Sequence, residues 1–331
     1  MMAWWMMAVF VMGALAATYQ NPVWSGDFAD PFVLLNKGNY YAYATSYHDA
    51  GADPSINIPS LMSEGGSLTD WKYMGDALPV LPPWAEANAG LTWAPAVLAR
   101  NGTFIMYYTA HYTAIRKQCL SYAISESPLG PFTDPNIAQP WLCQQSLGGS
   151  IDASPFVDPN GDLFLVWKNN GNCCAKKVNI WSQPMNPSGT SFVPGSSATP
   201  LITNDQAWEG VLVEGPSMLA RANPVSGYDY YLFYSASVFQ SYKYAVGYAR
   251  CSSPSGPCEK PTFSPILAYY GDVWGPGGEQ PFEDIHGNLW FCYHAWTAPN
   301  GKEGSPLHTS ASQTSDLFLS NVPLCCPLPS H

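Results

Sequence analysis

The feature that most constrains the fold of this chain is a pattern that occurs five times along it. Each copy has a polar or small residue close to a proline, a short apolar run, a turn of Gly, Asn or Asp, and a second run rich in aromatic residues. The copies begin near residues 30, 93, 152, 214 and 280, at intervals of about 60 residues. Because a strand-rich unit repeated at a constant period is typical of a propeller blade, the sequence predicts an all-β, five-bladed β-propeller.

The clearest copy runs from Ser150 to Trp167. Its two apolar runs are joined by an Asn-, Asp- and Gly-rich turn at 158–162, which supplies the positive φ angles that a β-hairpin needs. We assign the two aspartates of this turn, and Asp284 in the fifth copy, to hairpin geometry. Asp152 differs, because it stands before the first strand, where packing does not call for an acid.

Composition limits the possible partners. The 331 residues are 47% hydrophobic and 11% charged, which allows a large core and favours strands and turns over surface helices. The formal net charge of −11 argues against nucleic acid and anionic membranes as partners. We expect a monomer whose partner is a neutral polysaccharide or oligosaccharide.

The chain divides into three predicted parts. Residues 1–17 form an apolar run that ends in Ala-x-Ala, which predicts a signal peptide and a secreted, extracellular protein. A membrane anchor is the alternative, although the run is short for a span. Residues 18–322 form a single propeller, with 19–27 a candidate to close the last blade, and 323–331 form a loose tail.

Nine cysteines suit a secreted chain in which some pair. We expect disulfides Cys119–Cys143 and Cys251–Cys258, and a free thiol at Cys292 inside the core. No cysteine spacing resembles a zinc site. The sequon Asn101-Gly102-Thr103 coincides with a predicted hairpin turn and should be exposed.

The innermost strand of each propeller blade begins at the central channel, so equivalent positions of the blades face one another. In this chain these positions hold Asp30, Ala94, Asp152, Glu214 and the pair Glu279-Gln280. Asp30, Asp152 and Glu214 should therefore converge on one pocket. Crowded carboxyls raise at least one pKa, and one protonated acid beside one carboxylate is what hydrolysis of a glycosidic bond requires.

Aromatic residues next to these acids offer flat faces for a sugar ring, notably Trp93 and Phe32. Each residue also has a plain structural alternative. Asp30 precedes a proline and suits a turn, Asp152 can cap a turn, Glu214 can lie in a solvated bend, and Trp93 can be core. The functional interpretation depends on the shared register of the three acids.

The order and spacing of these segments resemble glycoside hydrolase family 43 over nearly the whole mature chain. The matching segments are Asn21-Pro22, Asp27-Phe28-Ala29-Asp30-Pro31, Trp93-Ala94-Pro95, Ser150-Ile151-Asp152, Glu214-Gly215-Pro216 and Tyr293-His294-Ala295-Trp296. The resemblance implies a five-bladed propeller and an inverting mechanism on arabinosides or xylosides. It makes Asp30 the general base and Glu214 the general acid, with Asp152 holding Glu214 in position and tuning its pKa.

Three positions depart from the family pattern. Gly275-Pro276-Gly277-Gly278 stands where the family often has Gly-Pro-Gly-His, Ala96 stands where an acid is common, and no Arg follows Tyr293-His294-Ala295. We expect His294 and Glu279 to contact substrate, with a core histidine as the alternative for His294. We expect no cofactor, and a calcium ion in the central channel is the alternative.

The sequence thus predicts a secreted inverting glycoside hydrolase that acts on arabinan or arabinoxylan, with a slight preference for arabinan. A carbohydrate-binding propeller that has lost turnover is the alternative, motivated by the absent His and Arg. A third interpretation is an interaction scaffold in which the acids only shape turns.

Overall fold

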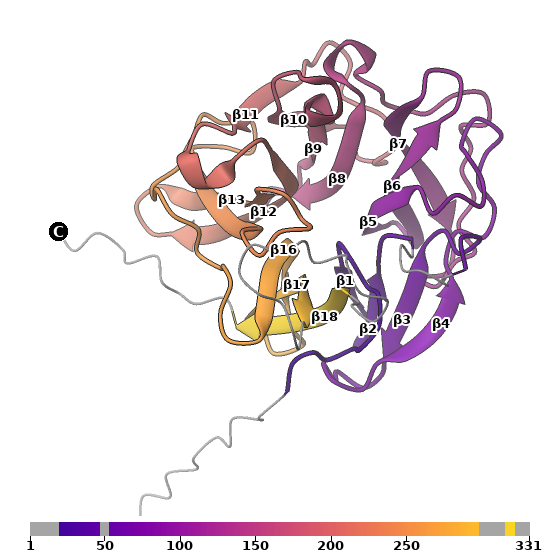
Figure 1. The fold of residues 1–331 in the computed structure, drawn as a ribbon, viewed down its shortest axis with the longest axis horizontal. Helices are drawn as coiled ribbons and strands as arrows, with labels where there is room; N and C mark the ends of the chain where they lie inside the picture. The colour runs from indigo at the N-terminus through magenta and orange to yellow at the C-terminus, as the bar shows by residue number, and fades with distance from the viewer. Residues whose placement is uncertain (1–19, 47–52, 298–314, 322–331) are drawn as a thin grey trace, which may run out of the picture.

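The computed structural model describes residues 20–46, 53–297 and 315–321. The predicted signal peptide and C-terminal tail lie outside these residues. Hydrogen-bond pairing groups the strands into five antiparallel sheets, which stand round a central axis (Figure 1). The fold is therefore an all-β β-propeller.

The sheets follow one another in chain order. The first contains β1 (Phe32–Asn36), β2 (Asn39–Tyr43), β3 (Pro59–Ser63) and β4 (Lys72–Asp76). The second contains β5 (Thr92–Arg100), β6 (Thr103–Tyr112) and β7 (Lys117–Ser125). The third contains β8 (Ser150–Val157), β9 (Leu163–Asn169), β10 (Asn179–Met185) and β11 (Thr199–Thr203).

The fourth sheet contains β12 (Val213–Asn223), β13 (Gly227–Ala236), β14 (Ala245–Cys251) and β15 (Cys258–Glu259). The fifth contains β16 (Val273–Glu283), β17 (Leu289–Thr297) and β18 (Ser315–Asn321). Three single-turn helices lie in the connections: η1 (Gln145–Leu147), η2 (Gly171–Cys174) and η3 (Ala207–Glu209). Among the described residues no helix is long and apolar enough to cross a membrane.

The core consists of seams between neighbouring sheets. Five large clusters of buried apolar side chains join the first sheet to the second, the second to the third, the third to the fourth, the fourth to the fifth, and the fifth back to the first. In the last seam Val33 and Tyr40 pack with Phe282 and Cys292. Hydrophobic burial therefore closes the ring even though different parts of the chain supply its two ends.

The predicted hairpin turns are confirmed. In the turn between β8 and β9, one oxygen of Asp158 accepts the N–H groups of Asn160 (2.8 Å) and Asp162 (3.0 Å). Asp284 plays the same part between β16 and β17. Asn101 lies exposed in the turn between β5 and β6, as predicted for the sequon. These turns lie at the ends of the hairpins away from the start of each innermost strand.

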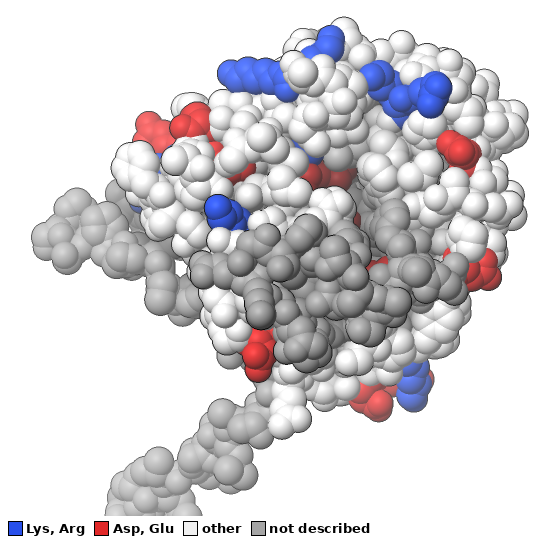
Figure 2. Space-filling model, viewed as in Figure 1, with Lys and Arg blue, Asp and Glu red and all other residues white. Residues whose placement is uncertain are grey.

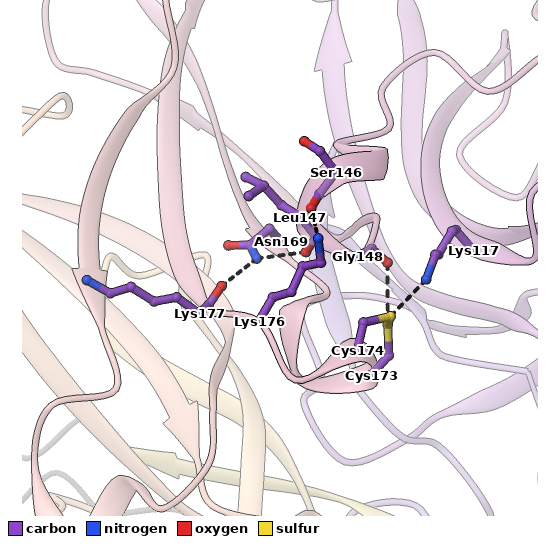
Figure 3. The surroundings of a disulfide bond; sticks show 9 residues. All are labelled: Lys117, Ser146, Leu147, Gly148, Asn169, Cys173, Cys174, Lys176 and Lys177. Carbon is purple, nitrogen blue, oxygen red and sulfur yellow. Dashed lines mark hydrogen bonds between the residues drawn. A yellow bond between two sulfur atoms is a disulfide. The ribbon is translucent and has the colours of Figure 1, made fainter.

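The predicted disulfides Cys119–Cys143 and Cys251–Cys258 are confirmed, and Cys292 is a buried free thiol. A third disulfide, between the adjacent residues Cys173 and Cys174 in η2, was not predicted (Figure 3). The lead-in at 19–27 forms no strand in its described part. Its residues Val23 and Trp24 instead pack against the seam between the first and fifth sheets.

Candidate active site

One residue near the start of each innermost strand has a left-handed backbone. We call these five positions the axial slots, and their φ values are 48° at Asp30, 45° at Ala94, 58° at Asp152, 55° at Gly215 and 59° at Gly278. In the second to fifth sheets the strand pairing is interrupted at this point. The predicted register is therefore wrong at two acids, because Glu214 comes one residue before its slot and Glu279 one residue after.

The N–H of each slot residue donates to a side chain, and in four cases that side chain belongs to the second strand of the preceding sheet or its end. Ala94 donates to Thr45 (2.9 Å), Asp152 to Thr109 (3.3 Å), Gly278 to Ser235 (2.9 Å) and Asp30 to His294 (3.0 Å). These hydrogen bonds connect neighbouring sheets round the axis. They also hold the non-glycine slots in a conformation that costs about 1–2 kcal/mol for an L-residue.

We call the residues at this position the belt: Thr45, Thr109, Lys168, Ser235 and His294. Lys168 is the exception among them. It pairs with Ile151, beside Asp152, but an ammonium has no lone pair and cannot accept a hydrogen bond. The N–H of Gly215 donates instead to Asp152 Oδ2 at 3.0 Å, and Lys168 Nζ donates to Glu214 Oε2 at 2.9 Å. The Lys168 side chain is fully buried, so this ion pair is shielded from water.

A second donor fixes the other oxygen of Glu214. The Tyr244 hydroxyl donates to Glu214 Oε1 at 2.9 Å, and burial raises the pKa of Tyr244 well above its ordinary value. Tyr244 therefore remains a neutral donor at any pH of interest. With both oxygens held and 16% of its side chain exposed, Glu214 faces a site that a ligand can reach.

Asp152 retains a proton near neutral pH. Burial raises its pKa to about 7; the Lys168 cation lowers it, and the charges of Glu214 and Asp30 raise it further. The structure brings the three acids to the axis: Asp30 and Asp152 line one cavity, and Asp152 bonds the N–H of Gly215, the residue after Glu214. Figure 2 shows acidic side chains inside the central hollow of the propeller.

His294 positions Asp30. Its Nδ1 accepts the Asp30 N–H and must be unprotonated, and burial lowers the pKa of His294 although the Asp30 charge opposes this effect. Its ring stacks on Tyr244 with a centroid separation of 5.8 Å. Only 3% of His294 is exposed, so the predicted direct contact with substrate gives way to support of Asp30. The other anchor of Asp30 is the Thr45 hydroxyl, 2.6 Å from Oδ2.

The same histidine explains the departure at Gly278. A Cβ atom at position 278 would lie 2.6 Å from His294 Nδ1 and 2.8 Å from Asp30 Oδ1. Both distances are shorter than any real contact of a Cβ atom, so a side chain at 278 and this arrangement of His294 and Asp30 exclude each other. Glycine is required here by space as well as by its positive φ.

A cavity of about 50 Å³ lies on the axis among the slots and the residues that follow them. It has room for a few water molecules. Glu279 lines it at 3% exposure, with Oε2 bonded to the Ser235 hydroxyl, and burial raises the pKa of Glu279 well above its ordinary value. Glu279 thus belongs to the wall of the axis, and its expected contact with substrate stays a prediction.

Phe32 and Trp93 flank the site in different ways. Phe32 lines the axial cavity and also packs against the seam between the first and second sheets, so it is partly core. Trp93 is half-buried and holds the position one before the slot in its sheet, which is the position of Glu214 in the fourth sheet. Trp93 and Glu214 thus occupy equivalent positions in the second and fourth sheets.

The belt and Tyr244 were missed by sequence reasoning, although a signal for the belt exists. The second strand of four copies contains an aromatic residue followed by a polar one: Tyr108-Thr109, Trp167-Lys168, Tyr234-Ser235 and Tyr293-His294. The polar member is in each case the belt residue. Tyr244 lies before β14 and no repeat marks it.

The fold and the site together define a β-propeller with a trio of interacting carboxyls at its axis, an arrangement suited to acid–base chemistry. The model of glycosyl hydrolases family 43 matches residues 19–314, and the chain belongs to this family. A probable arabinan endo-1,5-alpha-L-arabinosidase A of Aspergillus fumigatus is 25% identical, over 82% of this chain and 84% of that protein.

Solved structures agree with this assignment. A thermostable family-43 glycoside hydrolase has a TM-score of 0.74 and 28% identity, covering 91% of this chain and 92% of that chain. An endo-1,4-beta-xylanase from Bacteroides thetaiotaomicron has a TM-score of 0.66 and 25% identity, covering 90% of this chain and 95% of that chain.

Proposed function

We propose that this protein is a secreted glycoside hydrolase that cleaves arabinose- or xylose-containing plant polysaccharide with inversion, arabinan being favoured over xylan. Residues 18–322 form the catalytic domain, and each of the five sheets is one blade. The observation that supports the proposal most is the cluster of Asp30, Asp152 and Glu214 within one site. Family membership and the similarity to an arabinosidase named for arabinan point the same way.

In the proposed reaction Glu214 acts in its protonated form, in which it no longer forms an ion pair with Lys168. It donates that proton to the glycosidic oxygen as the bond from that oxygen to the anomeric carbon breaks. Asp30 removes a proton from a water molecule, whose oxygen bonds to the opposite face of the same carbon. Inversion requires the two carboxyls to stand roughly 6.5–9.5 Å apart. Products and protons then balance, since Asp30 gains the proton that Glu214 has lost.

Asp152 acts through position and charge. Its carboxyl holds the N–H of Gly215 and so fixes the backbone that carries Glu214. Its own proton, retained up to a pH of about 7, limits the negative charge that Asp30 and Glu214 meet. Lys168 and Tyr244 orient the Glu214 carboxyl, and His294 and Thr45 orient Asp30.

We propose that the reaction uses no metal ion. The described residues contain no group of three His, Cys, Asp or Glu side chains placed to hold one, and Gly278 offers no ligand. Glu279 Oε1 is a buried oxygen without a hydrogen-bond partner, but among the described residues no two further His, Cys, Asp or Glu side chains are placed to share a metal ion with it. Treatment with a chelator should therefore leave activity unchanged, and a loss restored by calcium would contradict this.

The test compares leaving groups. The protein is assayed on linear arabinan, arabinoxylan, nitrophenyl arabinofuranoside and nitrophenyl xyloside, with product configuration followed by NMR. Glu214→Gln should lose about 10³-fold on arabinan but far less on nitrophenyl glycosides, because nitrophenolate leaves without a proton. Asp30→Asn should lose activity on both. Retention of configuration would overturn the mechanism, and full activity of both variants would overturn the site.

A carbohydrate-binding propeller without turnover is the second candidate, favoured by the absence of an Arg after Tyr293-His294-Ala295. It predicts that arabinan binds, as measured by calorimetry, while no reducing sugar is released from any substrate of the panel.

A further inference from the structure

Four basic side chains gather on one rim of the propeller, between the second and third sheets. We call Arg116, Lys117, Lys176 and Lys177 the basic rim. Lys117 is half-buried and the other three are exposed. Among the described residues, none of the eight ion pairs includes any of these four. In a chain of net charge −11, four cations without an ion-pair partner on two neighbouring segments form a local field of the opposite sign.

The segments that carry these cations are held firmly. The buried Asn169 side chain donates to the carbonyls of Leu147 (3.1 Å) and Lys177 (2.9 Å), which ties the loop after β9 to η1 (Figure 3). The Lys176 ammonium donates to the Ser146 carbonyl. Lys117 Nζ lies 2.8 Å from Cys174 Sγ, so the disulfide of η2 borders the same cluster. A fixed array of cations loses less entropy on binding than flexible side chains do.

The basic rim lies at the catalytic end of the fold. Strand pairing sets Ile151 opposite Lys168, so the loop that follows β9 rises beside Asp152. The turn at 113–116 joins β6 to β7 at the same end, where Thr109 of β6 holds the Asp152 N–H. Figure 2 shows Lys and Arg side chains along the upper edge of the face whose central hollow contains the acids.

A groove continues from the rim. A cavity of about 660 Å³ runs between the outer strands of the third and fourth sheets, and its lining includes Lys177, Gln206 and the exposed ring of Phe263. Its volume is in the range of ligand-binding sites. Lys177 at one end, with an aromatic face and polar groups along the length, suits a sugar chain. Asp205 and Glu259 also line the cavity, so its length favours neutral units and the carboxylates of such a chain belong at the rim.

We propose that the basic rim binds uronic-acid carboxylates on the polysaccharide that carries the sugar to be cleaved. The inference rests on the proposed hydrolysis for its purpose, but the binding itself does not depend on turnover. The neutral sugar enters the acidic axis, while charged units of the same polymer contact the rim and neutral units continue into the groove. The rim thereby selects neutral branches or blocks that adjoin acidic ones.

The test uses galacturonate oligomers and the same oligomers fully methyl-esterified, which differ only in charge. Affinity electrophoresis and calorimetry should show tighter binding of the charged oligomers, weakened by added salt. The double variant Lys176→Gln, Lys177→Gln should bind them about 3–10-fold more weakly, as expected for two exposed charge contacts. Lys37→Gln, Lys72→Gln is the matched control, because both lysines lie exposed on the first sheet, and its affinity should match the wild type.

Equal affinity for charged and esterified oligomers would overturn the inference, as would equal weakening in both double variants. Polyglutamate of matched length should bind less tightly than the oligomers, and equal affinity would reduce the rim to general attraction of polyanions and refute a sugar site. Hydrolysis of nitrophenyl arabinofuranoside is measured in parallel and should be unchanged in both variants. If the wild type fails to hydrolyse it, the proposed function fails, while the binding data still decide the rim.

Discussion

Asp152 lies at the axial end of one hairpin and Asp284 lies in the turn at the outer end of another. The pKa values of these two aspartates shift in opposite directions. At Asp284 burial acts to raise the pKa, but hydrogen bonds from Asn288, Trp290 and His286 outweigh it, and the pKa of Asp284 is lowered. At Asp152 burial raises the pKa to about 7, and only the backbone N–H of Gly215 bonds to its carboxyl. Asp152 has fewer donors than Asp284, it is more strongly desolvated, and the charges of Glu214 and Asp30 act on it as well.

The comparison separates carboxylates that stabilise the propeller from those that serve its axial site. A turn aspartate such as Asp284 is surrounded by donors that favour the ionised form, so it stabilises the fold. Asp158 accepts hydrogen bonds from its own turn in the same way. Among the axial carboxyls, Asp152 lies beside Asp30 and Glu214 with one donor, so its charge is costly, and a pKa of about 7 makes its proton exchangeable near neutral pH. Exchangeable protons are what acid–base catalysis uses.

The largest expected effect is the contrast between neutralising an axial aspartate and neutralising a turn aspartate. Asp30→Asn should lower kcat by about 10³–10⁴-fold on every substrate, because a general base contributes an effect of that order. Asp158→Asn in the third hairpin should keep nearly full activity. Steady-state kinetics and thermal unfolding of both variants measure this contrast. Comparable losses of activity would mean that the axis has no special part in the reaction.

Asp152→Asn should lower kcat by about 10–100-fold and change two pH profiles. The folded pKa of about 7 lies above the ordinary 3.8, so ionisation of Asp152 opposes folding, and the wild-type free energy of unfolding should fall as pH rises from about 4 to 7. The variant should lose this dependence and gain about 1–2 kcal/mol at neutral pH.

The activity profile of Asp152→Asn provides a second measurement. Removing one negative charge from the axis makes the remaining acid lose its proton more easily, so the alkaline limb of kcat/KM should move to lower pH. Urea unfolding and initial rates across the pH range test both statements. An unchanged alkaline limb would show that Asp152 does not share the proton of the site.

The repeat predicted the hairpins, the turns and the meeting of Asp30, Asp152 and Glu214, because strand period and turn chemistry are local properties. It gave the wrong register at Glu214, because the slot in that sheet is Gly215 and glycine hides a positive φ that an acid makes conspicuous. Treating Gly215 and Gly278 as the slot residues of the fourth and fifth copies would have aligned all five copies correctly.

The roles of His294 and Glu279 could not be predicted, because burial at the axis depends on how five sheets close. From sequence alone, a histidine within an aromatic strand suits a ligand contact as well as a structural role. The structural role becomes visible only when the Asp30 N–H is seen to donate to His294 Nδ1 at 3.0 Å. The disulfide of Cys173 and Cys174 was missed because adjacent cysteines rarely suggest pairing. Tyr244 was missed because no repeated residue marks the segment before β14.

A smaller effect is expected from the groups that hold Glu214. Lys168→Met and Tyr244→Phe should each lower kcat by about 10-fold, since each removes one of two donors. The Lys168 cation lowers the pKa of Asp152, so its loss should move the alkaline limb to higher pH, opposite to the shift in Asp152→Asn. Tyr244→Phe removes no charge and should leave the limb in place. Parallel shifts in both variants would contradict the assigned electrostatics.

The smallest effect on activity, and the clearest on stability, is expected from Asp284→Ala. Its loss frees the N–H groups of His286 and Asn288 and the indole of Trp290, so the free energy of unfolding should fall by about 1–3 kcal/mol at neutral pH. Because the folded pKa of Asp284 lies below 3.8, this stabilisation is present above that value and disappears as pH falls through the folded pKa. Wild type and variant should therefore converge in acid, with kcat equal wherever both are folded. Urea unfolding along a pH series measures the convergence, Asp158→Ala serves as the matched turn, and a loss of stability that persists in acid would show that packing, not ionisation, sets the role of the turn.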